Sequence, residues 1–359
     1  MAFRNINGRE KISDTDEDLR KLLETRKAVI KVVGVGGAGN NTLSRMMQVG
    51  IVGAEIIAAN TDAQDLLYTD ADEKILLGKD LTRGLGAGAD PKVGGEAARE
   101  SREMIKESLQ GADMAFITCG LGGGTGTGAS PVIAEIAKKL GLLTVGVVTL
   151  PFTMEGKCRM ENARFGLEEL EKNVDTLIVI PNDKLLEVVP DVSIITAFKI
   201  CDEILVNAVK GVTELVTKPG LVNLDFADIK AVMSTGGLAM IGLGESNTEN
   251  RAVEAVEKAL NNPLLDVDIE GACGALVNVS GGTDVTIREC QEIVEAISSK
   301  ISNDAKIIWG AQIEKELGDM VRTLIIVTGV KPNQIYGTGD FFSSEKQQQI
   351  EKILGIEFL

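Results

Sequence analysis

Apolar, β-branched segments that end in glycine-rich turns alternate with amphipathic segments along the first half of this 359-residue chain. Such alternation indicates a mostly parallel sheet flanked by helices, in which ligands bind at the carboxyl ends of the strands. The expected strands span residues 29–35, 55–59, 114–119, 143–150 and 176–180. The expected helices span residues 39–50, 94–109, 130–140 and 159–173.

A long apolar helix and a second α/β unit follow. Apolar residues repeat at intervals of three and four over residues 193–217, which predicts a helix buried between two domains. Further strands are expected at 238–243, 275–279, 306–312 and 323–328, with helices at 250–260 and 286–301. The chain is thus divided into a polar leader (1–27), a ligand-binding domain (28–192), a central helix (193–217), a C-terminal α/β domain (218–330) and a tail (331–359).

Composition excludes several kinds of chemistry. The chain has no histidine, so an imidazole base, a Ser-His-Asp triad and an HExxH zinc site are ruled out. A net charge of −16 disfavours binding to nucleic acid and to anionic membrane surfaces. Five widely spaced cysteines without a CxxC pair fit reduced thiols, and no apolar run is long enough to span a bilayer. We therefore expect a cytoplasmic protein with no fixed metal site and no membrane insertion.

The first glycine-rich segment, GVGGAGNN at 34–41, lies between a predicted strand and a predicted helix. Glycines let backbone N–H groups and a helix N-terminus approach a phosphate. Gly34, Gly36 and Gly39 match GxGxxG, and Asp62 follows at the distance of a ribose-binding acid. This segment alone is typical of a nicotinamide-dependent oxidoreductase, or of a tight turn without a ligand.

A second segment, residues 120–128, also follows a strand and contains GGGTGTG at 122–128. It lacks the lysine of a GxxxxGK[ST] loop, so its donors are backbone amides and the hydroxyls of Thr125 and Thr127. A third glycine-rich run at 84–91 lies over the same pocket or is a structural turn. Converging loops suit a highly charged ligand such as a nucleoside triphosphate with Mg²⁺.

Together these segments resemble the FtsZ family of tubulin-like cell-division GTPases, and its archaeal members most. The resemblance covers residues 28–330 and includes NTDAQ at 60–64, TRGLGAGADP at 82–91, TLPFTMEGKCR at 149–159, IPNDKL at 180–185 and VNLDFADIK at 222–230. It implies the tubulin/FtsZ fold, in which a Rossmann-like parallel-sheet GTPase domain is joined by the central helix to a smaller α/β domain. It also implies GTP and GDP as ligands, Mg²⁺ held with the nucleotide, and head-to-tail filaments that form the division ring at mid-cell.

The resemblance also implies a set of nucleotide-binding residues. Asp202, Asn182 and Phe198 match the guanine site, where a carboxylate accepts the N1–H and 2-amino hydrogens that adenine lacks. Phe198 is alternatively a packing residue of the helix stripe. The remaining assigned residues are Gly36, Gly37, Ala38, Asn40, Asn41, Asn60, Thr61, Asp62, Gly86, Ala87, Gly88, Gly122, Gly123, Gly124, Thr125, Gly126, Thr127, Glu155 and Arg159.

None of these loops holds an obvious group to activate water. The best carboxylate pair is Asp225 and Asp228, which from the residues alone is a catalytic pair or a helix N-cap. In the FtsZ family this loop enters the nucleotide site of the next subunit, which assigns Asn223, Asp225 and Asp228 to catalysis in trans. A related protein that binds nucleotide without hydrolysing it would lack these acids. The resemblance further suggests that residues 356–359 dock on a membrane-anchor protein, or else pack on the second domain.

Overall fold

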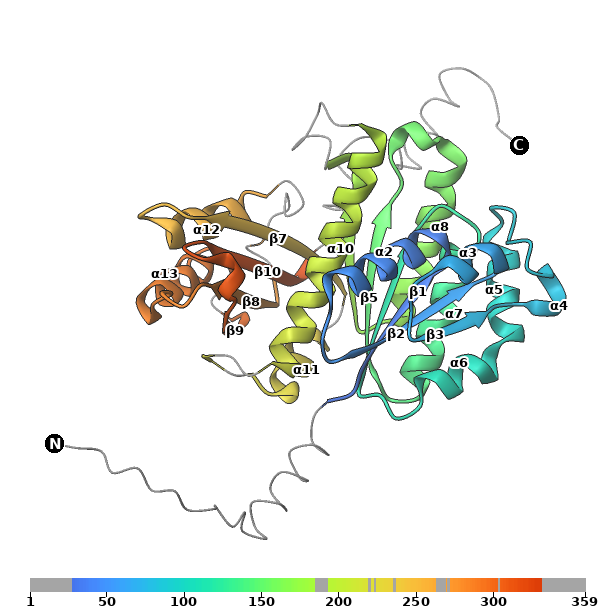
Figure 1. Cartoon of the computed structure of the whole chain (residues 1–359), viewed down its shortest axis with the longest axis horizontal. Helices are drawn as coiled ribbons and strands as arrows, with labels where there is room; N and C mark the ends of the chain where they lie inside the picture. The colour runs from blue at the N-terminus through green and yellow to red at the C-terminus, as the bar shows by residue number, and fades with distance from the viewer. Residues whose placement is uncertain are drawn as a thin grey trace, which may run out of the picture.

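The computed structural model describes residues 28–184, 193–218, 221–222, 224–234, 237–262, 269, 272–302 and 304–330. The predicted leader, the tail and Asn223 lie outside the described residues. Figure 1 shows an α/β protein in which the parallel-stranded half and the C-terminal half lie on either side of helix α10.

Ten strands form one continuous sheet in the order β3-β2-β1-β4-β5-β6-β7-β10-β8-β9. Strands β3 to β6 are parallel throughout, whereas β10 runs antiparallel to both β7 and β8. The halves are joined where β6 pairs with β7 over only two residue pairs. The strands are β1 (Ile30–Val35), β2 (Ala54–Asn60), β3 (Glu73–Leu76), β4 (Met114–Gly120), β5 (Leu143–Leu150), β6 (Thr176–Pro181), β7 (Leu238–Ser246), β8 (Gly274–Gly281), β9 (Lys306–Ile313) and β10 (Val321–Val330).

Helices cover both faces of the sheet. They are α2 (Gly36–Val49), α3 (Ala63–Tyr68), α4 (Lys79–Thr82), α5 (Pro91–Glu100), α6 (Arg102–Leu109), α7 (Thr125–Lys139), α8 (Lys157–Asn173), α10 (Ile194–Thr217), α11 (Phe226–Met233), α12 (Arg251–Leu260) and α13 (Ile287–Ser298). Short 3₁₀ turns, η1 (Thr153–Glu155) and η3 (Lys315–Leu317), complete the described elements.

The strand predictions are confirmed, with differences of a few residues at the ends. The single helix expected at 94–109 is wrong, because the chain forms α5 and α6 with Ser101 between them. The Ser101 hydroxyl accepts a hydrogen bond from the Gly78 N–H, and this tertiary contact holds the break. Strand β3 and helices α3, α4 and α11 are too short to have produced a periodic signal.

Side chains of successive strand residues enter two separate cores. Val32 belongs to the core under α2, α10 and α11, whereas Val33 belongs to the core under α5, α6, α7 and α8. Strand residues on both faces are buried, which is typical of a parallel sheet covered on both sides. The core under α10 includes residues from both halves of the chain, such as Leu143 and Ile326, so the predicted buried central helix is confirmed.

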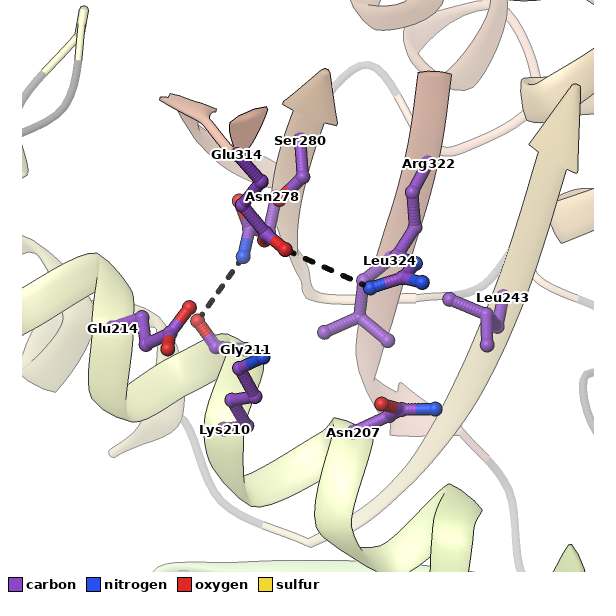
Figure 2. A pocket seen from close by; sticks show the side chains of 10 residues that line it. All are labelled: Asn207, Lys210, Gly211, Glu214, Leu243, Asn278, Ser280, Glu314, Arg322 and Leu324. Atoms are coloured by element: carbon purple, nitrogen blue, oxygen red, sulfur yellow. Dashed lines mark hydrogen bonds and ion pairs between the residues drawn. The ribbon is translucent and has the colours of Figure 1, made fainter. Parts of the chain in front are cut away.

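Close packing fixes α10 against the C-terminal strands (Figure 2). The Asn278 side-chain amide donates to the Gly211 carbonyl at 3.2 Å, and a Cβ atom at Gly211 would lie 2.2 Å from Leu324 Cδ2. Above them, the Arg322 guanidinium lies 3.9 Å from the Glu314 carboxylate. The remaining gap of about 20 Å³ holds no more than a water molecule. Glycine at 211 therefore allows α10 to contact both halves.

Candidate nucleotide-binding site

A cavity of about 450 Å³ lies at the carboxyl ends of the parallel strands. Val35 and Gly120 end β1 and β4, Thr149 lies near the end of β5, and Asn182 follows β6, and all four line the cavity. Helices α2, α7, α8 and α10 contribute the rest of the wall. The position and size are those of a small-molecule site in an open α/β sheet.

Two helices begin at this cavity without a side-chain cap. Helix α2 starts at Gly36 and α7 at Thr125, so both begin earlier than predicted and include most of their glycine motif in the first turn. Neither N-cap residue, Val35 or Gly124, makes a side-chain hydrogen bond to the helix, whereas Asp62, Asp90 and Asp225 cap α3, α5 and α11. Free N–H groups at two helix N-termini are suited to phosphate binding.

The glycines let the phosphate-facing segments touch. A Cβ atom on Gly36 would lie 2.9 Å from the Gly126 nitrogen, and one on Gly124 would lie 2.8 Å from the Asp90 nitrogen. The contact between Gly36 and Gly126 brings the 34–41 and 120–128 loops together. The contact between Gly124 and Asp90 places the 84–91 loop against the 120–128 loop. Gly36 also has a φ of +72°, a conformation that favours glycine.

Residues 60–62 lie behind the second loop rather than on the cavity wall. The Thr61 and Thr125 hydroxyls are 2.6 Å apart, and Thr125 lines the cavity. The Asp62 carboxylate accepts from the Gln64 and Asp65 N–H groups as the cap of α3. Asn60 donates to Asp65 at 2.6 Å. Because Asp62 caps α3 and does not line the cavity, the structure gives no support to the ribose-binding acid of a nicotinamide enzyme.

Other assigned residues also shape the loops from behind. The buried Thr127 hydroxyl accepts from the Gly122 N–H at 2.9 Å, and the buried Asn40 amide donates to Asp65 at 3.0 Å. The third loop is tied to the chain at 60–62, since the Gly86 N–H donates to the Thr61 carbonyl at 3.2 Å. The assigned residues that do not line the cavity are Asn40, Asn60, Thr61, Asp62, Gly86, Ala87, Gly88, Gly122 and Thr127.

Helix α10 forms another part of the cavity wall. Phe198, Cys201, Asp202 and Leu205 follow helical spacing on one face and all line it. The exposed Phe198 ring packs edge-on against Phe152 with centroids 5.4 Å apart, which leaves its other surface free for a planar ligand. Burial raises the pKa of the Cys201 thiol to about 12, so this cysteine is not a thiolate nucleophile.

Asp202 is a half-buried carboxylate in the cavity wall. Burial raises its pKa, and the hydrogen bond from Thr42 and the charge of Arg45 oppose that shift. Asn182 is 5% exposed, and its side-chain Oδ1 has no hydrogen-bond partner among the described residues. A buried carboxylate and an unpartnered amide oxygen are acceptors that a ligand with N–H donors satisfies.

Glu155 of η1 and Arg159 of α8 also line the cavity. Arg159 Nη1 is 2.7 Å from Glu155 Oε2, and the other Glu155 oxygen accepts from the Phe152 N–H. The guanidinium is half exposed, so it remains accessible to an anionic ligand.

The acidic loop lies outside this cavity. Asp225 is the N-cap of α11 and accepts from the Asp228 N–H at 2.8 Å, which confirms the N-cap interpretation of the pair. In Figure 1, α11 lies at the lower end of α10. The α10 residues that line the cavity lie in the first half of that helix, between Phe198 and Leu205. About 22 Å of helix separates Asp202 from the end of α10 at Thr217, at 1.5 Å per residue.

Several cavity residues were not predicted. Cys201 and Leu205 could have been found from their helical spacing with Phe198 and Asp202. Gly120 and Leu121 directly precede GGGTGTG, and Thr149 and Pro151 lie within the TLPFTMEGKCR motif. Within the described ranges, no group of three or more Cys, Asp or Glu residues is arranged to hold a metal ion. None of the described helices is long and apolar enough to cross a membrane.

Comparison with known proteins agrees with this geometry. The model of the GTPase domain of the tubulin/FtsZ family matches residues 29–190, and that of the C-terminal domain of the FtsZ family matches residues 237–331. "Cell division protein FtsZ 1" of Thermococcus kodakarensis is 67% identical over 318 residues, which are 89% of this chain and 85% of the relative.

Solved structures agree as well. The "FtsZ dimer, empty" of M. jannaschii superposes with a TM-score of 0.85 at 60% identity, covering 88% of this chain and 92% of that one. CetZ2 from Haloferax volcanii, described as a "GTPgS bound protofilament", has a TM-score of 0.76 at 21% identity over 91% of this chain and 99% of its own. At that identity the second likeness shows a shared fold.

Proposed function

Because this chain belongs to the FtsZ family, we propose that its cavity binds GTP and that a second copy of the chain completes the site for hydrolysis. The chain is a GTPase of the tubulin/FtsZ type, and it acts in cell division by assembling into filaments. The assignment of individual residues, Mg²⁺, the position at mid-cell and the anchoring partner are parts of the proposal.

The observation that carries the nucleotide assignment is the pairing of two chemistries across one cavity. Two uncapped helix N-termini, at Gly36 and Thr125, supply N–H donors to the cavity. The Asp202 carboxylate and the Asn182 amide, which line the same cavity, supply acceptors. A guanine nucleotide complements both, because its phosphates accept hydrogen bonds and its N1–H and 2-amino groups donate them. Mg²⁺ coordinated by the phosphates would offset their charge.

Hydrolysis is assigned to the acidic loop of a neighbouring copy. Asp225 is exposed and Asp228 is partly exposed, at the end of α10 far from the nucleotide cavity. Two complementary surfaces at opposite ends of one molecule form a head-to-tail contact that does not close, and such a contact produces filaments. In that contact Asp225, Asp228 and Asn223 would orient the attacking water, since the two carboxylates that line the cavity, Glu155 and Asp202, are assigned to contacts with Arg159 and the base.

Phosphate release across a series of protein concentrations tests this function. With GTP and Mg²⁺, we expect the rate to rise more steeply than the protein concentration, because assembly creates the catalytic sites. ATP should give little release at any concentration, and EDTA should suppress release from GTP. A GTP rate strictly proportional to protein concentration would mean that the monomer carries its own catalytic group.

The tail proposal concerns residues 356–359, Ile-Glu-Phe-Leu, which lie outside the described residues. We propose that this segment docks on a membrane-anchor protein and so concentrates the filaments at mid-cell. Deleting residues 350–359 should leave GTP turnover within about twofold of wild type and disperse a fluorescent fusion from the division site. Unchanged localisation of the truncated protein would remove the docking proposal without affecting the GTPase assignment.

A further inference from the structure

The candidate guanine-reading carboxylate is held by a residue from another helix. The Thr42 hydroxyl on α2 donates to Asp202 Oδ1 on α10 at 3.0 Å, although the two residues are 160 positions apart in sequence. Thr42 is fully buried and does not line the cavity. Among the described residues, no other hydrogen bond to the Asp202 carboxylate is present. An ionised carboxylate has about four lone-pair sites, so acceptor capacity remains for a ligand in the cavity.

Thr42 is well suited to hold this carboxylate in one orientation. A threonine in a helix has few allowed χ1 rotamers, and Thr42 Oγ1 also lies 3.1 Å from the Ala38 carbonyl of its own helix. The hydroxyl has a single proton, and a carboxylate attracts it more strongly than a neutral carbonyl does. By contrast, the χ2 torsion of an aspartate is broad and about twofold, so an unheld carboxylate would rotate.

The neighbouring charges do not replace this bond. Arg45 lies three residues after Thr42 on α2, and its guanidinium pairs with the Glu203 carboxylate at 2.5 Å. The guanidinium therefore has its own carboxylate partner, and its charge favours the ionised form of Asp202 only from a distance. Among the described residues, the Thr42 hydroxyl is the side-chain group that donates a hydrogen bond to the Asp202 carboxylate.

We propose that Thr42 is a positioning residue for base selection: its hydroxyl fixes the Asp202 carboxylate in the plane that accepts the N1–H and 2-amino hydrogens of guanine. This inference rests on the proposed guanine site. It goes beyond that site by assigning part of the selectivity to a residue that never touches the nucleotide. Adenine makes neither hydrogen bond and hypoxanthine makes one, so the effect of removing the hydroxyl depends on the base.

The test measures dissociation constants of the full-length protein for GDP, IDP and ADP, because diphosphates avoid turnover during the measurement. Thr42→Val keeps the shape of the side chain and removes the hydroxyl. We expect its affinity for GDP to fall about tenfold, its affinity for IDP to fall less, and its affinity for ADP to stay within about twofold. Thr42→Ser keeps the hydroxyl and should restore GDP affinity to within about twofold of wild type.

A matched control comes from the other end of α10. The Thr217 hydroxyl makes the same kind of bond to a carbonyl four residues earlier, at 2.9 Å, and does not line the cavity. Thr217→Val should therefore leave all three affinities unchanged. If Thr42→Val does not fold, Thr42→Ala removes the same hydroxyl with a smaller side chain and provides the same comparison.

Asp202→Ala, measured in parallel, separates this inference from the proposed function. If Asp202→Ala lowers the preference for GDP over ADP and Thr42→Val does not, the role of Thr42 is overturned and the guanine site stands. A loss of affinity in Thr42→Val that is equal for all three nucleotides also overturns it, since that is the result of a purely structural role. If Asp202→Ala leaves the preference unchanged, the guanine assignment fails and this inference fails with it.

Discussion

Replacing Asp228 by alanine should lower steady-state GTP turnover at least about 100-fold, the usual effect of removing a group that moves or orients a reacting proton. The affinity for GTP should stay within about twofold of wild type, because Asp228 lies on α11 and does not line the nucleotide cavity. Phosphate release under saturating GTP and equilibrium binding of a non-hydrolysable GTP analogue measure the two quantities separately.

The control for this variant must remove the same charge elsewhere. Glu257→Ala on α12 changes the net charge by the same amount at an exposed position far from α11 in sequence. It should leave turnover unchanged. Sedimentation of the Asp228→Ala protein with GTP then shows whether filaments still form. Filaments that assemble and hydrolyse GTP at the wild-type rate would contradict the catalytic assignment.

Asp225 needs a different substitution, because it caps α11. Loss of a helix N-cap costs about 1 kcal/mol on its own. An alanine at this position would therefore mix a stability effect with a catalytic one. Asparagine also caps helices well, so Asp225→Asn isolates the charge of the carboxylate from its structural role.

Replacing Asp202 by alanine should reduce the preference for GTP over ATP about 100-fold, mainly through weaker binding of GTP. In the proposed site the carboxylate accepts two hydrogens from guanine, whereas adenine offers it no donor and leaves Thr42 as its hydrogen-bond partner among the described residues. Competition of GTP and ATP against a bound fluorescent nucleotide gives the ratio directly. A ratio equal to that of the wild type would remove the guanine assignment.

A second substitution at Asp202 is expected to increase the relative affinity for another nucleotide instead of only weakening GTP binding. Asp202→Asn replaces one acceptor oxygen by an amide that donates. Xanthine has a carbonyl where guanine has its 2-amino group, so the variant should bind XTP better relative to GTP than the wild type does. General damage to the cavity would weaken both nucleotides and could not produce this reversal.

The parallel sheet was predictable because buried β-branched runs between glycines leave few alternatives. The starts of α2 and α7 were not, since glycine has a poor helix propensity and four glycines in six residues favour a loop prediction. In the structure the two motifs pack closely together, so that a Cβ atom on Gly36 would lie 2.9 Å from the Gly126 nitrogen, and this packing is not visible in either motif alone. The break at Ser101 depends on Gly78, which is 23 residues away, so no local pattern reveals it.

In the site, too, the motifs could be predicted from the sequence, whereas the contacts between distant parts of the chain could not. The resemblance assigned Asp202, Arg159 and Thr125 to nucleotide binding, and in the structure all three line the cavity. It did not distinguish residues that face the cavity from residues that support the loops, such as Thr61 behind Thr125 and Thr127 beneath Gly122. That distinction depends on which side chains are buried. The contact between Thr42 and Asp202 could not be predicted from the sequence, because the two residues lie on different helices.

The central claim is that one copy of the chain binds GTP and the next supplies the acids, and mixing two inactive variants tests it most directly. Asp202→Ala keeps the acidic loop and binds GTP more weakly, so its nucleotide site stays almost empty at a GTP concentration that just saturates the wild-type site. Asp228→Ala keeps GTP binding and loses the acid. In a random equimolar filament, about a quarter of contacts join an intact nucleotide site to an intact acidic loop. The mixture should recover up to about that fraction of the wild-type GTP turnover, although each variant alone is inactive. A mixture that forms filaments and stays inactive would contradict catalysis in trans.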